Sequence, residues 1–592
     1  GYFQFYYNVV GNKLLIAILL SILVTILDGI GLTMFMPLLQ AVSGGSASSS
    51  ESMGNLHFIT DAIAALGIPL TLGTVLAIVA VLFSLKGFAK FSELNYQAKV
   101  IQFFMKRIRH ELVNNLQKTS YRGFTKLDAG KIQNIFIAEV QRMSQAVKSY
   151  LSYSQQLFML GTYVLLALLA NYQFAILVAI SSGLANLLYR RINRLMKKAS
   201  LEISEKGHHF NSYMIQGINY FKYLKSTNYL HSYSRKLDEV IDKTEHINKK
   251  TGLYSAISMG IREPITMLIV VIVIFIQLNW LGGNLGSIIL SLLLFYRALT
   301  FLMGIQFHWQ SFIQNTGAMR TVADLSEIMK SDNESHGNIP FISMENEIKI
   351  ENTDVSYGSA KVLKNINITI PKNNTIALVG PSGSGKTTLA NIIIGLITPD
   401  SGQVLLDGIP LLQFDLPGYR SKIGYISQDS VIFNDDIYNN ITFWSERTPE
   451  NENRFWEVIK MAYLDDFVMN QPEKELTRLG DNGILISGGQ KQRISIAREM
   501  FKKVEIMILD EATSALDSET EFIIQENIEN LHGRYTMIVI AHRLSTIRNV
   551  DTIYLLDKGE ISVSGNFETM IESSDKFKRM VDLQGLTKAS TL

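Results

Sequence analysis

Long apolar segments alternate with long polar stretches over the first half of this 592-residue chain. Several of the apolar segments are long enough, with their flanks, to cross the ~30 Å hydrocarbon layer of a bilayer as helices. The pattern therefore predicts six membrane-spanning helices. They cover about residues 14–37, 70–85, 157–170, 174–188, 264–280 and 285–303.

The two longest polar stretches are rich in helix-forming residues, and apolar residues recur in them at helical spacing, as in Ile108, Leu112 and Leu116. We interpret these stretches as cytoplasmic extensions of the spanning helices. Each extension is interrupted once, at residues 121–130 and at residues 214–223, where aromatic side chains cluster around glycines. Such turns either dock a cytoplasmic domain or belong to ordinary helix–turn–helix packing.

Basic residues fall on one side of the predicted spans. The connection over residues 41–66 contains no Lys or Arg, whereas the two long polar stretches are rich in both. By the positive-inside rule, the long stretches and both termini face the cytoplasm. This asymmetry disfavours the alternative that the apolar segments are buried helices of a large soluble core. Because the chain begins with Gly1 rather than Met, we expect a short N-terminal piece to be missing.

Strands and helices alternate after a polar stretch at residues 331–346, which we interpret as a linker. The domain boundaries predicted from this pattern are residues 1–330 for a transmembrane domain and residues 347–592 for an α/β domain. The predicted fold is thus an α-helical transmembrane bundle followed by an α/β P-loop NTPase domain.

A glycine-rich loop between a short apolar strand and a helix carries the clearest chemical signal in the chain. Its residues are Gly380, Pro381, Ser382, Gly383, Ser384, Gly385, Lys386, Thr387 and Thr388. Glycines let backbone N–H groups turn inward and cradle phosphate oxygens, and the helix that follows presents its positive end. Lys386 can reach the β- and γ-phosphates, and the Thr387 hydroxyl can hold Mg²⁺. A glycine-rich turn that binds nothing would not require both residues.

Polar residues at the ends of other predicted strands fit the same chemistry. Gln428 is placed to approach Mg²⁺ and an attacking water, and Asp510 to hold Mg²⁺ through water. Glu511 is placed as the general base for that water, and His542 to sense or polarise the γ-phosphate. Tyr357, at the end of an early strand, could stack on adenine. Each of these residues, taken alone, also has an ordinary structural explanation.

A second anion-binding loop is predicted at Ser487, Gly488, Gly489 and Gln490, immediately before a helix.

Charged residues within or beside the predicted spans form a further group, namely Asp28, Lys86, Arg262 and Arg297. Charges in apolar spans are costly and often functional. If they face inward, Lys86, Arg262 and Arg297 would line a basic cavity suited to a phosphate headgroup. The alternative is that they snorkel or pair structurally, for example Asp28 with Arg297.

The phosphate loop, Gln428, residues 486–490, 506–511 and 514–517, and His542 follow one another in the order found in the ATP-binding cassette of ABC transporters. The chain resembles that cassette over residues 347–592. The resemblance implies ATP and Mg²⁺ as cofactors and adenine stacking by Tyr357. It also implies that residues 486–490 form the signature loop, with Ile486 in place of the commoner Leu. Within residues 514–517, Asp517 is implied to contact ATP, and the presence of Glu511 and His542 implies a hydrolytically competent site.

Six spans ahead of one cassette resemble the half-transporters of the exporter class. There two cassettes pair head to tail, so a homodimer is implied, and the breaks at residues 121–130 and 214–223 resemble coupling helices. Residues 28–39 and 221–225, with Tyr296 and Arg297, look like the bacterial subgroup that includes flippases of lipid-linked oligosaccharides.

The sequence therefore predicts ATP-driven export or flipping of an anionic lipid across a bacterial inner membrane. A multidrug, peptide or lipid A-type exporter remains an alternative, and an ATP-gated channel or regulator is an alternative of another class. The formal net charge of +2 does not suggest a nucleic-acid partner, and the lack of cysteine excludes disulfides and thiolate metal sites.

Overall fold

The computed structural model describes residues 2–35, 37–38, 63, 65, 67, 71–170, 172–279, 285–510, 526, 529, 531–541 and 543–584. The chain divides into two compact units, which we describe separately. The first unit comprises residues 1–119 and 123–333, and the second comprises residues 120–122 and 334–592.

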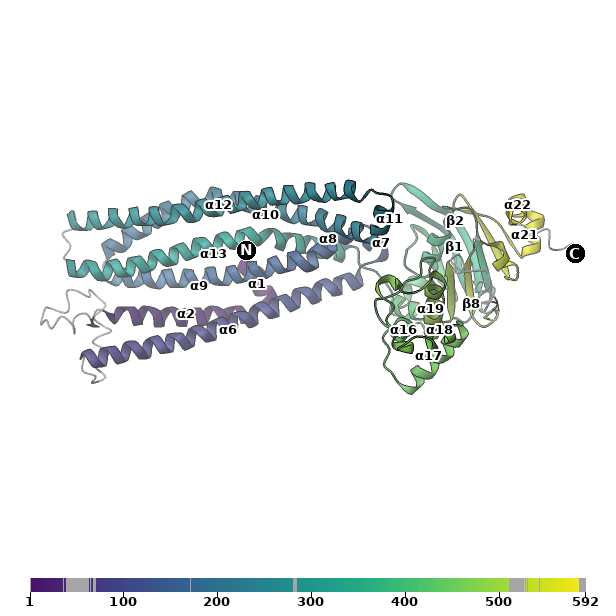
Figure 1. The fold of residues 1–592 in the computed structure, drawn as a ribbon, viewed down its shortest axis with the longest axis horizontal. Coiled ribbons are helices and arrows are strands. Elements are labelled where there is room, and N and C mark those ends of the chain that lie inside the picture. The colour runs from purple at the N-terminus through teal and green to yellow at the C-terminus, as the bar shows by residue number, and fades with distance from the viewer. Residues whose placement is uncertain are drawn as a thin grey trace. The chain divides into compact units, whose positions relative to one another are not determined.

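The first unit is a bundle of long helices (Figure 1). Five of its helices run for 31 to 50 residues, so each extends well beyond the apolar segment that it contains. The main helices are α1 (Tyr2–Val10), α2 (Asn12–Thr33), α6 (Leu72–Lys118), α9 (Val140–Ala170), α10 (Tyr172–Asn219), α12 (Leu230–Asn279) and α13 (Leu285–Ser331). Among the described residues, α2 and α6 are by length and composition able to cross a membrane.

Short elements interrupt the two predicted cytoplasmic extensions. The first break contains α7 (Tyr121–Phe124) and α8 (Ala129–Asn134), followed by a π-helix at Ile135–Glu139 that the sequence pattern did not indicate. The second break contains α11 (Phe221–Ser226). It lies a few residues beyond the predicted position, because α10 continues to Asn219.

The second unit contains two sheets. An antiparallel sheet has the strand order β2-β1-β4-β5, and a second sheet has the order β10-β9-β3-β8-β7-β6, in which only β10 runs antiparallel to its neighbour. The strands are β1 (Glu347–Tyr357), β2 (Ala360–Pro371), β3 (Thr375–Val379), β4 (Ser401–Leu406), β5 (Ile409–Pro410), β6 (Ile423–Ile426), β7 (Ile506–Asp510), β8 (Thr536–Ile540), β9 (Thr552–Asp557) and β10 (Glu560–Gly565).

Every residue of β3 and β7 is buried, as expected for parallel strands that are covered on both faces. The helices of this unit are α14 (Lys386–Ile393), α15 (Leu416–Ser421), α16 (Ile437–Thr442), α17 (Pro449–Met461), α18 (Asp465–Met469), α19 (Gly488–Phe501), α21 (Phe567–Ser573) and α22 (Asp575–Leu583). The predicted fold class, a helical membrane domain followed by an α/β NTPase domain, is confirmed.

The boundary between the units falls at residues 333 and 334, so most of the stretch predicted as a linker packs with the second unit. The Ile339 N–H donates to the Gln413 carbonyl at 3.1 Å, and the Asp415 N–H donates to the Ile339 carbonyl at 2.8 Å. Met344 is 1% exposed. These contacts attach the segment to the sheet domain.

The buried Arg498 connects α19 to the segment that follows β6. Its Nε donates to the Asn440 carbonyl at 2.6 Å, and its guanidinium also donates to the Val431 carbonyl at 2.8 Å. Asn440 in turn donates through Nδ2 to the Phe433 carbonyl at 3.0 Å. A planar guanidinium satisfies several buried carbonyls at once, which an aliphatic side chain cannot do.

We predict that Arg498→Met lowers the stability of the second unit by about 3 kcal/mol or more, because the buried backbone carbonyl and the buried side-chain Oδ1 of Asn440 each lose a donor, at ~1–3 kcal/mol for each loss. Thermal unfolding of the full chain, followed by intrinsic fluorescence, measures this change. Lys361→Met is the control, since the Lys361–Asp354 ion pair is surface-exposed and such pairs contribute little. Equal melting temperatures for the two variants would contradict the role of Arg498.

Candidate functional site

The phosphate loop joins the buried strand β3 to α14. Gly383 and Gly385 adopt positive φ angles of 78° and 106°, a region that residues with a Cβ rarely adopt. A Cβ added to Gly385 would lie 2.5 Å from Cδ2 of Leu363, whereas one added to Gly383 would meet no atom within 4 Å. The loop is therefore packed against the protein on one side and open at Gly383.

Polar groups of this loop match the demands of a phosphate ligand. Lys386 is 7% exposed, and its Nζ donates to the Gly380 carbonyl at 2.9 Å and to the Pro381 carbonyl at 3.1 Å. The Ser384 hydroxyl is buried and has no hydrogen-bond partner among the described residues. The ammonium is held beside the loop, while Thr387 and Thr388 lie in the first turn of α14.

Asp510 is the last residue of β7 and is 6% exposed. Tyr425 of the neighbouring parallel strand β6 donates its hydroxyl to Asp510 Oδ2 at 3.2 Å. Burial, together with the charge and hydrogen bond of Asp510, raises the pKa of Tyr425 well above its usual value, so the phenol stays protonated and remains a donor. The sequence analysis missed this partner, although Tyr425 lies only three residues before Gln428.

Strand topology brings most of the predicted nucleotide residues to one edge of the parallel sheet. The loop after β3, Gln428 after β6 and Asp510 of β7 all follow the carboxyl ends of strands in the same sheet, which is where ligands bind in open α/β sheets. Gln428 is exposed. Tyr357 ends β1 of the other sheet and is 43% exposed, so its ring is accessible for stacking.

The predicted signature loop forms the start of α19. Ser487 caps the helix by accepting from the Gln490 N–H at 3.3 Å, and the Gln490 side chain accepts from the Ser487 N–H at 2.9 Å. This capping box makes a regular helix N-terminus at Gly488 and Gly489. Lys491 Nζ donates a hydrogen bond to the Asn482 carbonyl in the preceding turn at 2.7 Å.

Three predicted site residues, Glu511, Asp517 and His542, lie outside the described residues.

In the membrane unit, the structure pairs Asp28 with Lys86 rather than with Arg297. Lys86 makes an ion pair with Asp28 Oδ1, and Tyr163 donates its hydroxyl to Asp28 Oδ2 at 2.9 Å. Asp28 is only 3% exposed. The prediction that Lys86 lines a basic cavity therefore needs correction, because a buried carboxylate neutralises its charge.

A second polar layer lies two helical turns away on the same three helices. The fully buried Glu93 accepts from Ser21 at 2.6 Å, from Lys90 at 2.9 Å and from Gln155 at 3.1 Å. The sequence analysis missed Glu93. A signal was present in the sequence. Ser21 and Asp28 are seven residues apart on α2, and Lys86 and Glu93 are seven residues apart on α6, so antiparallel packing of the two helices would pair Asp28 with Lys86 and Ser21 with Glu93.

Arg297 lies in α13, half-buried between the buried residues Leu294 and Ala298. It makes no ion pair with the described residues. Arg262 lies within α12, but its side chain is not among those that the structure describes.

Comparisons with known proteins agree with both units. A family model described as "ABC transporter" matches residues 363–514, and one described as "ABC transporter transmembrane region" matches residues 14–303. An ATP-dependent lipid A-core flippase of Syntrophus aciditrophicus is 30% identical over 500 residues, which cover 83% of this chain and 82% of that protein. A heterocyst differentiation ATP-binding protein of Nostoc sp. is 28% identical over 81% of this chain and 79% of its own length.

The solved structure of a bacterial Atm1-family ABC exporter with ATP bound has the same fold, with a TM-score of 0.81 and 20% sequence identity, covering 99% of this chain and 100% of that one. The phosphate loop after β3, the capped helix start at Ser487 and the match to the transmembrane region together settle the family. The chain belongs to the ABC transporters, as an exporter-type half-transporter with an ATP-binding domain that couples ATP hydrolysis to transport across a membrane.

Proposed function

We propose that this chain forms a homodimer that flips or exports an anionic, amphipathic lipid, such as a lipid-linked oligosaccharide, across a bacterial inner membrane. The observation that carries the proposal is Arg297, a cation within an apolar helix that no described acidic side chain neutralises. A charge in this setting is costly unless it serves a ligand or pathway. The similarity to a lipid A-core flippase supports a lipid substrate.

The nucleotide is proposed to bind at the carboxyl edge of the parallel sheet. Backbone N–H groups of residues 382–385 would surround the phosphates, Lys386 would contact the β- and γ-phosphates, and Tyr357 would stack on adenine. Thr387, Gln428 and Asp510 would hold Mg²⁺, since hydroxyl, amide and carboxylate oxygens are the ligands that this ion prefers. When bound, Mg²⁺ offsets the negative charge of the phosphates.

Hydrolysis requires a base beside the phosphates. Glu511 follows Asp510 directly, so we assign it the removal of a proton from the attacking water. His542 follows β8, the strand between β3 and β7, and is assigned a contact with the γ-phosphate.

A second copy of the chain is proposed to complete each nucleotide site. The described hydrogen bonds of the signature loop join Ser487 to Gln490 and Lys491 to the preceding turn. We therefore propose that the start of α19, at Ser487–Gln490, binds the phosphates of the nucleotide held by the second copy. Asp517 would contribute at the same interface. ATP binding would favour the closed pair of cassettes and an outward-facing bundle, and hydrolysis would restore the inward-facing state, with the cassettes in the cytoplasm.

Glu511→Gln keeps the side-chain shape but removes the base, so we expect ATP hydrolysis to fall by about 10²- to 10⁴-fold while ATP binding persists. Phosphate release and retention of labelled ATP measure the two effects. Glu505→Gln is the matched control, since this carboxylate precedes β7 at the opposite end of the strand and accepts from the Met344 N–H at 3.0 Å. Normal turnover in Glu511→Gln would refute the base assignment.

Tyr425→Phe removes the hydroxyl that orients Asp510. We expect a higher Mg²⁺ concentration for half-maximal ATP hydrolysis, by roughly three- to tenfold, because only part of the ~1.5–3 kcal/mol of a hydrogen bond to a charged group is passed on to the metal that Asp510 would hold. Electron paramagnetic resonance of bound Mn²⁺ gives an independent readout of metal affinity. Tyr419→Phe, which loses a buried hydrogen bond to the Ile393 carbonyl, should alter stability but not metal dependence. Identical metal titrations for both variants would remove Tyr425 from this role.

Arg297→Ala should abolish ATP-dependent translocation of a polyprenyl-pyrophosphate glycolipid in proteoliposomes, whereas Arg297→Lys should retain part of it because the charge remains. Basal ATP hydrolysis by each variant reports folding. If the wild-type chain moves no glycolipid, and peptides or apolar drugs stimulate its ATP hydrolysis instead, the substrate is a drug or peptide. In that case Arg297 is structural.

A further inference from the structure

A pocket of about 430 Å³ opens in the membrane unit. It is formed by α1, α6, α9 and α13. Its α13 residues begin at Met319, which lies 22 positions beyond Arg297, or about 33 Å along the helix at ~1.5 Å per residue. The pocket is therefore separate from the proposed lipid path at Arg297.

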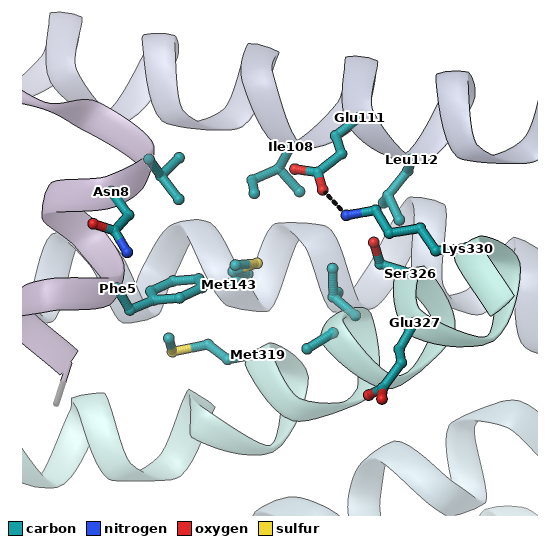
Figure 2. A pocket seen from close by; sticks show the side chains of 13 residues that line it. Phe5, Asn8, Ile108, Glu111, Leu112, Met143, Met319, Ser326, Glu327 and Lys330 are labelled. Carbon is teal, nitrogen blue, oxygen red and sulfur yellow. Dashed lines mark hydrogen bonds and ion pairs between the residues drawn. The ribbon is translucent and has the colours of Figure 1, made fainter.

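Apolar side chains line the body of the pocket. Phe5 projects from α1, Ile108 and Leu112 from α6, and Met143 and Met319 from α9 and α13 (Figure 2). Methionines adapt their shape to irregular apolar ligands. A cavity of this volume falls within the range that encloses a drug-sized molecule.

Polar groups mark the two ends of the pocket. Asn8 lies at the end formed by α1, and at the other end Glu111 of α6 pairs with Lys330 of α13 at 2.6 Å (Figure 2). Just beyond this ion pair, Asn115 donates to the Ser326 hydroxyl at 2.8 Å. The apolar body is thus closed by charged and polar contacts between α6 and α13.

The charge of the lining is not balanced. Two carboxylates, Glu111 and Glu327, stand against one ammonium, Lys330. Glu327 is exposed and makes no ion pair with the described residues. The lining therefore carries one excess negative charge beside an apolar surface, and a ligand that complements it has one positive charge and an apolar body.

The position of α1 brings such ligands within reach. α1 ends at Val10, and the apolar helix α2 begins at Asn12. On the outer face of α1, Phe3 and Tyr7 are exposed and stack at 6.2 Å. Aromatic side chains beside the start of a span are typical of the membrane–water interface, where amphipathic cations accumulate.

We propose that this pocket binds a monocationic amphipathic molecule, with its apolar body against Phe5, Met143 and Met319 and its positive charge toward the Glu327 carboxylate, which unlike Glu111 makes no described ion pair. The pocket is a second small-molecule site of the transporter and does not depend on the identity of the transported lipid. Because its walls come from α1, α6, α9 and α13, a bound ligand would add apolar contacts to the Glu111–Lys330 and Asn115–Ser326 bonds that join α6 to α13 at this level.

Tetraphenylphosphonium and tetraphenylborate test the charge argument, because they have nearly the same shape and opposite charge. Binding of each is measured by equilibrium dialysis to the full chain in phosphatidylcholine nanodiscs, with binding to empty nanodiscs subtracted. We expect saturable binding of one tetraphenylphosphonium per chain, with an affinity roughly tenfold above that of tetraphenylborate. Equal affinity for the two ions would overturn the proposal.

Two variants locate the binding to this pocket. Ala323→Trp places an indole over the opening from the exposed side of α13 and should weaken tetraphenylphosphonium binding at least about tenfold. Glu327→Gln, a change that threatens folding less, should weaken it about two- to fivefold. Glu239→Gln, an exposed carboxylate of α12 outside the pocket, is the matched control. Binding that is unchanged in both pocket variants would place the cation elsewhere and overturn the proposal, while basal ATP hydrolysis shows that the variants are folded.

Discussion

The chemistry of the second unit depends on one constraint, the parallel pairing of β3, β8, β7 and β6. Parallel strands must be covered on both faces, so β3 and β7 are buried throughout and are apolar apart from Thr375 and Asp510. Where they end, the chain must turn away, and the phosphate loop and Asp510 emerge at the same edge. The pairing of Ile426 with Leu509 also sets Tyr425 beside Asp510. A one-residue shift of β6 would turn the Tyr425 side chain to the other face.

A different constraint organises the membrane unit, since a charge in an apolar helix must find a partner. Asp28 and Glu93 meet this requirement in two layers, both built from α2, α6 and α9. Breaking either layer would leave a buried charge unpaired, so these three helices are expected to move as one body. Arg297 makes no ion pair with the described residues of either layer, which is why it is the cation that we connect with substrate.

The pocket beside α1 follows from the same bundle at its polar end. At this end of the bundle the helices no longer need a continuous apolar surface. The Glu111–Lys330 ion pair joins α6 to α13, and Met143 of α9 lines the apolar part of the pocket. The result is an apolar cavity with a charged rim at the level where α2 begins. The transported substrate and the pocket ligand would thus carry opposite charges. The protein offers the positive Arg297 to the substrate within the span and negative carboxylates to the ligand at the rim of the pocket.

Much of this organisation is contained in the local sequence. The apolar segments predicted the long helices, and residues 380–388 predicted the phosphate loop, because a glycine-rich turn between strand and helix is a short-range feature. Gln428 and Asp510, which the sequence assigned to one Mg²⁺ site, lie at the same edge of the parallel sheet. The break near residue 220 was displaced by a few positions, and the π-helix at Ile135–Glu139 was missed, because both depend on how neighbouring helices pack.

Side-chain partners were beyond the reach of the sequence. The sequence suggested Arg297 as a possible ion-pair partner of Asp28, but the antiparallel packing of α2 on α6 brings Lys86 to Asp28 instead. Tyr425, Glu93 and the pocket beside α1 likewise require residues that are far apart in the chain to meet. The sequence by itself determined the family, the apolar segments of the long helices and the phosphate loop, since these are local patterns, and the residues that would bind ATP remain its prediction. Only the tertiary structure decided which charges cancel and which remain, because a charge is neutralised by whatever lies within a few ångströms of it.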